Sequence, residues 1–144
     1  MTTVRNVLQA KGNPVISVSP DTMVSTALEL MAEKNIGALV VMKDGALAGI
    51  FSERDFARKT ALKGKLAFDS IVGDLMTSIV FTVAPVQSID ECMAVMTAKR
   101  IRHLPVLEDQ RLIGVVSIGD VVKAVISEKE HLIAQLENYI TGAR

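Results

Sequence analysis

Apolar residues recur at helical spacing in two separate stretches of the chain. Each stretch places four of them at positions i, i+3, i+4 and i+7, which form one face of an α-helix. The first set is Val24, Ala27, Leu28 and Met31, and the second is Ile89, Cys92, Met93 and Met96. Ser88 and Glu91 have the spacing of a capping box, in which each side chain bonds the backbone N–H of the other. The pattern therefore predicts two amphipathic helices and places the start of the second near Ser88.

Two short apolar runs follow the first of these helices and predict a β-hairpin. Ala38–Met42 and Leu47–Phe51 flank Asp44-Gly45, a dipeptide favoured in two-residue turns because glycine adopts positive φ readily. After the second helix, Asp109-Gln110 takes the place of this turn and fits it less well. A further strand is expected ahead of each helix, near Val15–Val18 in one case and Val80–Val83 in the other.

The chain is a tandem repeat. A shift of 65 residues aligns Asp55 with Asp120 and gives twelve identical pairs across the 38 positions from Val18 to Asp55. Chance gives roughly two or three, because common residues each make up less than about a tenth of proteins. Each copy is therefore expected to have the order β-α-β-β-α.

This repeat predicts an α+β fold in which two copies are related by pseudo-two-fold symmetry. Neither copy can bury both faces of a small sheet alone, so we expect the sheets to pack together with helices outside. Two equivalent clefts are then expected between the copies. The expected parts are an N-terminal segment (1–13), the first copy (14–63), a linker (64–76), the second copy (77–127) and a C-terminal helix extension (128–144).

The last part of the chain continues a helical stripe that is longer than the repeat requires. The stripe consists of Val121, Val122, Val125, Ile126, Leu132, Ile133, Leu136 and Ile140. Two interpretations are open for this apolar face. The helix either forms contacts between the subunits of a dimer or folds back onto the core of its own chain.

The two copies share the pattern G-h-h-S-x-x-D, as Gly49–Asp55 and as Gly114–Asp120, where a strand is expected to lead into a helix. Serine followed by an acidic residue three positions later is a capping signature that needs no ligand. The same groups also suit a nucleotide, because a helix N-terminus favours phosphate and a carboxylate accepts both hydroxyls of a ribose. Both interpretations can hold together, and the glycine would permit close approach of the backbone to a ligand.

Arg102 and His103 precede the middle strand of the second copy. A run of charges of this kind is often a solvated face. The alternative follows from position, because a strand start near an expected cleft would let Arg102 and His103 act with Arg54 and Arg58 to neutralise phosphates.

Composition narrows the class of partner. Sixteen Lys and Arg balance sixteen Asp and Glu, which argues against non-specific binding of nucleic acid. The chain has no Trp and only five other aromatic residues, which excludes an aromatic platform for single-stranded nucleic acid.

The sequence also predicts a cytoplasmic protein that does not span a membrane. The longest apolar stretch, Ile36–Phe51, is interrupted by charges and is too short for a membrane helix, and the N-terminus lacks a signal-peptide pattern. The single cysteine, Cys92, is expected in the core. No nucleophile elbow, Walker loop, dinucleotide fingerprint or metal-ligand cluster is present, so an enzyme is not expected.

The tandem organisation, the two G-h-h-S-x-x-D junctions, the helix entry at residues 18–22 and the Arg-His-Leu-Pro-Val motif at 102–106 together resemble a pair of cystathionine β-synthase (CBS) domains. The resemblance covers about Val15 to Ile126, and the ends are similar to small stand-alone bacterial members that consist only of the pair. It implies a regulatory, signal-transduction module that binds an adenine nucleotide (AMP, ADP, ATP or NAD(H)) between its repeats and forms a homodimer.

The resemblance also implies roles for particular residues. Asp55 and Asp120 would hold the ribose, and Ser52 and Ser117 would lie beside the ribose or the phosphate. The other implied ligand-binding residues are Arg54, Arg102 and His103 for phosphate, Thr22 at the helix entry, Ile16 and Phe81 flanking the adenine, and Ala38 offering its backbone to the base.

The two copies depart from this pattern in different ways. Gln87 stands where the first copy has Thr22, and Gly37-Ala38 stands where the second has Arg102-His103. The two clefts are therefore expected to differ in affinity or in ligand. The output of such a module would be read by a separate effector protein, or the chain would act as a nucleotide buffer. The alternative function is a ligand-free dimeric scaffold for protein interaction, in which the Ser-x-x-Asp pairs act only as helix caps.

Overall fold

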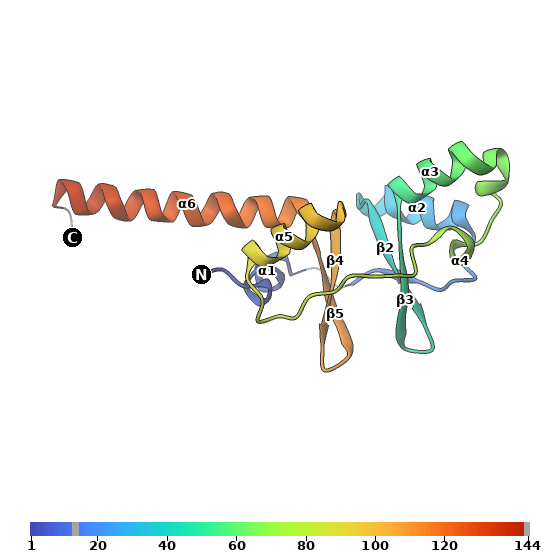
Figure 1. The fold of residues 1–144 in the computed structure, drawn as a ribbon, viewed down its shortest axis with the longest axis horizontal. Helices are drawn as coiled ribbons and strands as arrows, with labels where there is room; N and C mark the ends of the chain where they lie inside the picture. Colours follow the sequence, from blue (N-terminus) through green and yellow to red (C-terminus); the bar gives the residue numbers. More distant parts are fainter. Residues whose placement is uncertain (13–14, 143–144) are drawn as a thin grey trace. The chain divides into compact units, whose positions relative to one another are not determined.

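The computed structural model describes residues 1–12 and 15–142. Its elements, in chain order, are α1 (Val4–Lys11), β1 (Ser17–Val18), α2 (Val24–Lys34), β2 (Ala38–Lys43), β3 (Ala46–Ser52), α3 (Glu53–Lys63), the 3-10 helix η1 (Gly64–Ala67), α4 (Val72–Leu75), α5 (Ile89–Lys99), β4 (His103–Glu108), β5 (Arg111–Ser117) and α6 (Ile118–Thr141) (Figure 1). The α+β class and the repeat are confirmed, because α2, β2 and β3 recur as α5, β4 and β5 at an offset of 65 residues.

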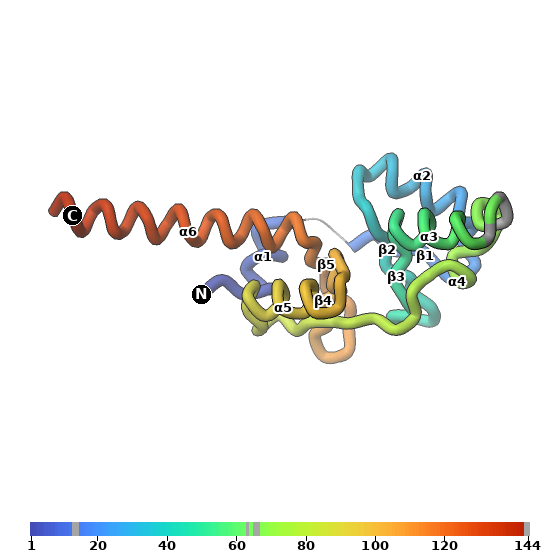
Figure 2. Tube along the Cα trace, turned by 45° about the horizontal axis from the view of Figure 1, so that its top comes forward, coloured from blue at the N-terminus to red at the C-terminus, as the bar shows by residue number. Residues whose placement is uncertain are grey.

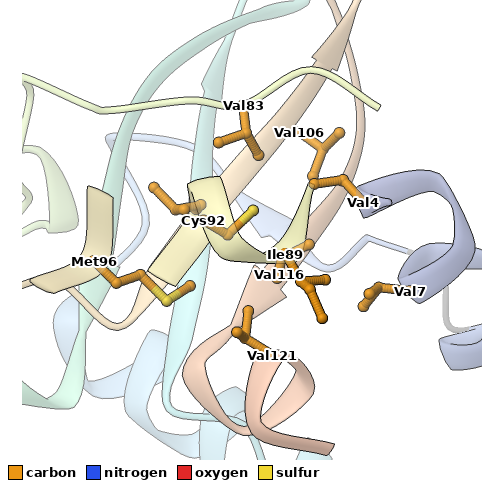
Figure 3. Packing of buried hydrophobic residues seen from close by; sticks show 10 residues of the cluster. Val4, Val7, Val83, Ile89, Cys92, Met96, Val106, Val116 and Val121 are labelled. Atoms are coloured by element: carbon orange, nitrogen blue, oxygen red, sulfur yellow. The ribbon is translucent and has the colours of Figure 1, made fainter. Parts of the chain in front are cut away.

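The chain divides into two units, each with its own buried core. The first unit holds β1, α2, β2, β3, α3 and α4, and the second holds α1, α5, β4, most of β5 and α6. Apolar side chains from every element of the second unit meet in its core, including Val4, Val83, Cys92, Val116 and Val121 (Figure 3). Cys92 is fully buried, as the sequence predicted.

Each copy of the repeat is completed by a helix from outside it. In the second unit, the N–H of Val4 on α1 donates to the carbonyl of Gln87 at 2.8 Å. In the first unit, the N–H of Val72 on α4 donates to the carbonyl of Thr22 at 2.8 Å. Both valines are fully buried. The N-terminal segment therefore serves the second copy, while the linker serves the first.

The predicted hairpins are present in both copies. Strands β2 and β3 pair antiparallel around Asp44 and Gly45, whose φ angles are 52° and 78°. Positive φ at both central residues defines the turn that suits the twist of a two-residue hairpin. Asp109 and Gln110 have φ angles of 51° and 64°, so the second copy makes the same turn without a glycine.

The first strand forms in only one copy. Strand β1 pairs parallel with β2, but the strand predicted at Val80–Val83 is wrong, since only Val83 makes a bridge, to Val106. Val83 donates to the carbonyl of Pro105 and accepts from Leu107. To extend this pairing toward the start of the predicted strand, the backbone N–H of residue 105 would have to donate the next hydrogen bond. Residue 105 is a proline, which has no N–H. Val40 occupies that position in the first copy.

Helix α6 continues far beyond the length of its counterpart. It has 24 residues, whereas α3 has 11. It runs as a single helix past α1 and α5 of its own unit (Figure 2). Val121 packs in the core, but every residue from Ile126 to Gly142 is exposed, so the interpretation in which the stripe folds back on its own core is wrong for this later part of the helix. No helix in the described part of the chain is both long enough and apolar enough to cross a bilayer.

Candidate functional site

Both Ser-x-x-Asp sequences form complete capping boxes, at two equivalent places. At the first junction, Ser52 Oγ accepts from the N–H of Asp55 at 3.0 Å, and Asp55 Oδ2 accepts from the N–H of Ser52 at 3.0 Å. At the second junction, the matching distances for Ser117 and Asp120 are 3.1 and 2.9 Å. The capping interpretation is therefore confirmed for α3 and α6. The boxes also fix a carboxylate beside each helix N-terminus.

The two aspartates differ in their third partner. Thr77, which follows α4, donates from Oγ1 to Asp55 Oδ1 at 3.0 Å. Lys11, the last residue of α1, donates from Nζ to Asp120 Oδ2 at 2.9 Å and to the carbonyl of Val115 at 2.9 Å. The first junction therefore holds a carboxylate with a neutral partner, and the second holds an ion pair.

The Lys11 ion pair changes the titration of Asp120. Burial alone would raise the pKa of this carboxyl, but hydrogen bonds from Ser117 and the neighbouring charge of Lys11 outweigh it, so the pKa of Asp120 lies below its ordinary value. Asp120 is therefore an anion at neutral pH.

Two glycines allow the completing segments to reach the junctions. A Cβ on Gly114 would lie 2.6 Å from Leu8 Cδ2, and one on Gly49 would lie 2.7 Å from both Met76 Sδ and the carbonyl oxygen of Thr77. The close approach that the sequence indicated is thus made by α1 and by the end of the linker. The expectation that these glycines admit a ligand was wrong, because side chains and backbone fill the space.

Arg102 and His103 lie at the second junction. The carbonyl of Arg102 accepts from the N–H of Ile118, the first residue of α6, at 2.8 Å. His103 begins β4 and is half-buried. Burial lowers the pKa of His103, the positive charges of Lys11 and Arg102 lower it further, and Asp120 partly opposes them. His103 is therefore neutral at pH 7, and the charges of Lys11, Arg102 and Asp120 all act on its pKa.

The first junction has no counterpart of Arg102 or His103. Gly37, whose carbonyl accepts from the N–H of Glu53 at 3.0 Å, takes the place of Arg102, and Ala38 takes the place of His103. Ala38 pairs with Ser52 across the hairpin. Arg54 and Arg58 are exposed on α3.

Thr22 shapes the loop before α2. Its Oγ1 accepts from the N–H of Ser19 at 3.2 Å. In the second copy, Gln87 Oε1 accepts the equivalent bond from the N–H of Ala84 at 2.7 Å. Gln87 Nε2 also donates to Glu91 Oε2 at 3.0 Å. Gln87 therefore replaces Thr22 structurally.

The remaining predicted residues are placed separately. Ile16 packs against the core of the first unit, and Phe81 is 38% exposed. The ligand contacts of Ile16, Thr22, Ala38 and Phe81, and the clefts to which they were assigned, stay predictions.

Sequence reasoning missed Lys11 and Thr77. A signal for Lys11 was present, because Thr3 caps α1 with a capping box, Val4, Val7 and Leu8 have helical spacing, and Gly12 ends the helix with a φ of 64°. What the sequence does not reveal is that α1 packs on the second copy. Within residues 1–12 and 15–142, no three His, Cys, Asp or Glu side chains gather at a spacing suited to a metal ion.

Comparison with known proteins agrees with this geometry. The family model described as "CBS domain" matches residues 4–61 and 72–127. The chain is 41% identical to the CBS domain-containing protein CBSX3, mitochondrial, of Arabidopsis thaliana over 98% of this chain and 73% of that one.

Similar solved structures include the following two. A putative signal-transduction protein with CBS domains from Burkholderia ambifaria has a TM-score of 0.83 and 48% identity, covering 88% of this chain and 95% of that one. CBSX2 in complex with AMP has a TM-score of 0.72 and 28% identity, covering 88% and 98%.

Proposed function

This chain belongs to the CBS-domain family and carries two copies of the domain, and from that premise we propose that it is a regulatory module that binds an adenine nucleotide at the N-termini of α3 and α6. The observation that carries the proposal is the carboxylate that each capping box holds at a helix N-terminus, with Lys11, Arg102 and His103 around the second. The complex of the related CBSX2 with AMP supports it.

The capping role of the aspartates is compatible with ribose binding. A carboxylate has about four lone-pair sites, so Asp55 and Asp120 can cap a helix and still accept from ribose hydroxyls. Lys11, Arg102 and His103 would then meet the phosphate, as charge-assisted donors do. Ile16, Phe81, Thr22 and the backbone of Ala38 would contact the remainder of the nucleotide. The ligand class is AMP, ADP, ATP or NAD(H), all of which carry phosphate.

We propose a binding role rather than a catalytic one. Asp55 and Asp120 each cap a different helix, and the groups that act most strongly on His103 are two cations and one anion. Two cations against one anion would favour a negatively charged ligand. Regulation then requires that the nucleotide bind one conformation of the protein better than another, and that a separate effector protein respond to the difference.

A thermal-shift titration tests the proposal. AMP, ADP, ATP, NAD⁺, NADH, S-adenosylmethionine and GTP are added to wild type, Asp55→Asn and Asp120→Asn. A ligand at a hundred times its Kd contributes about 2.7 kcal/mol, which raises Tm by several degrees. The proposal expects this shift with an adenine nucleotide and its loss in the variants. No shift with any ligand would favour the scaffold, for which the variants lose only a cap worth about 1 kcal/mol.

We also propose that the protein is a homodimer held together by α6. Val122, Ile126, Ile133, Leu136 and Ile140 are all about half exposed or more and follow a heptad pattern, which Lys129 interrupts at one position. Ile126, Ile133 and Ile140 take three successive a positions of this heptad pattern, and isoleucine at a favours a coiled coil of two identical helices. The residues of α6 beyond the length of α3 are exposed, and a second copy of this chain is the occupant we assign to the stripe.

A further inference from the structure

Lys11 links the N-terminal helix to the carboxylate of the second junction. Its ammonium lies 2.9 Å from Asp120 Oδ2 and 2.9 Å from the carbonyl oxygen of Val115. The side chains are 30% and 17% exposed for Lys11 and Asp120, so a ligand in solution can reach the pair. A ribose that binds Asp120 would therefore lie beside the Lys11 ammonium, which already occupies one of the two carboxylate oxygens.

The backbone of Lys11 is fixed while its ammonium is free to exchange partners. Val4 and Val7 of α1 are buried in the core of the second unit, and Leu8 fills the space above Gly114. The four-carbon side chain of lysine rotates readily and carries three donors. The ammonium can thus change acceptor without movement of α1.

The cost of that exchange depends on the ligand. A nucleoside would draw the ammonium away from its counter-ion and offer no anion in return. A nucleotide would offer phosphate, to which an ammonium makes a charge-assisted hydrogen bond. We propose that Lys11 makes the second junction selective for phosphate-bearing nucleotides over nucleosides, by moving from Asp120 to the phosphate as the ribose binds. This inference rests on the proposed nucleotide-binding function.

The first junction provides an internal control. Thr77 occupies the place of Lys11 there and donates a neutral hydrogen bond to Asp55. Gly37 and Ala38 add no charge. Removal of the Thr77 hydroxyl therefore changes the surroundings of a carboxylate without changing the charge that a phosphate would meet.

Isothermal titration of the full chain with AMP and with adenosine tests the role of Lys11. In an Asp55→Asn background, which leaves only the second junction intact, we expect AMP to bind more tightly than adenosine. Lys11→Met should reduce the ratio of the adenosine Kd to the AMP Kd about ten-fold or more, since a hydrogen bond to a charged group is lost. Lys11→Arg keeps the charge and should keep most of the ratio. In an Asp120→Asn background, Thr77→Val should leave the ratio unchanged.

The outcomes distinguish a failure of the role of Lys11 from a failure of the proposed nucleotide binding. Binding of both ligands with an unaltered ratio in Lys11→Met overturns the role of Lys11 and leaves the proposed function standing. Binding by wild type that disappears in Asp55→Asn also overturns it, because the ligand would then occupy the first junction alone. If wild type binds neither ligand, the proposed function fails, and the role of Lys11 fails with it.

Discussion

Leu8 occupies the space that a β-carbon on Gly114 would need. The distance from such a Cβ to Leu8 Cδ2 would be 2.6 Å, which is shorter than any ordinary carbon contact. The equivalent relationship in the first unit is between Gly49 and the segment Met76-Thr77, where both a side chain and a backbone oxygen lie at 2.7 Å. In each copy, the segment that completes the copy therefore packs directly against a glycine in the last strand.

The two glycine contacts predict which of two glycine-to-alanine substitutions destabilises the protein more. Gly49→Ala should lower the free energy of unfolding more than Gly114→Ala, because the backbone oxygen of Thr77 cannot move aside as the end of the Leu8 side chain can. Overpacking costs about 1–3 kcal/mol, and we expect Gly49→Ala at the upper end of that range and Gly114→Ala at the lower. Urea unfolding of both variants measures the order. Equal costs, or a larger cost for Gly114→Ala, would contradict it.

The turn between β4 and β5 can be improved. Gln110 has a φ of 64°, a conformation that strains residues with a β-carbon, while its counterpart Gly45 does not suffer this strain. Gln110→Gly should therefore raise the free energy of unfolding by up to about 1 kcal/mol. Gly45→Gln is the matched reverse change and should lower it. Thermal unfolding of the two variants checks the opposite signs, and a loss of stability in Gln110→Gly would contradict them.

Acid should weaken the second junction. Because the pKa of Asp120 is depressed in the folded state, its contribution to stability is present above the ordinary carboxyl pKa and is lost as pH falls through the lower, folded value. Asp120→Asn should therefore cost about 1–2 kcal/mol at pH 7, and the difference from wild type should shrink below about pH 4. Denaturant titrations between pH 3 and 7 measure the difference. A gap that stays constant across this range would contradict the ion-pair account.

Substitutions along α6 test the proposed dimer. Ile133 lies in the apolar stripe and is 54% exposed, so Ile133→Glu should convert a dimer to a monomer without unfolding the chain. Gln135 is exposed on the same helix outside the stripe, and Gln135→Glu adds the same charge as a control. Sedimentation velocity gives the mass of each. A wild-type monomer, or a dimer that persists in Ile133→Glu, would contradict the assignment.

The sequence specified the repeated parts of the fold well. The spacing of apolar residues located α2 and α5, and the Asp44-Gly45 dipeptide located the hairpin. The prediction of a strand at Val80–Val83 failed because the backbone N–H that would have paired with it is missing at Pro105. Pro105 lies in a different strand, so the local sequence pattern around Val80–Val83 does not reveal the loss. Lys11 was missed for a related reason, since its partner Asp120 is 109 residues away and only the packing of α1 joins them. Contacts that depend on which helix completes which copy are not local in sequence.

In the function we propose, Asp55 and Asp120 hold the ribose hydroxyls of an adenine nucleotide. Isothermal titration of wild type, Asp55→Asn and Asp120→Asn with AMP and with 2′,3′-dideoxy-AMP isolates this role, because the analogue lacks only those hydroxyls. We predict that the analogue binds wild type at least ten-fold more weakly than AMP, and that replacement of the aspartate at a junction abolishes the difference there, as interacting partners do in a double-mutant cycle. Equal affinity of wild type for AMP and for the dideoxy analogue would show that the two aspartates do not bind the ribose hydroxyls.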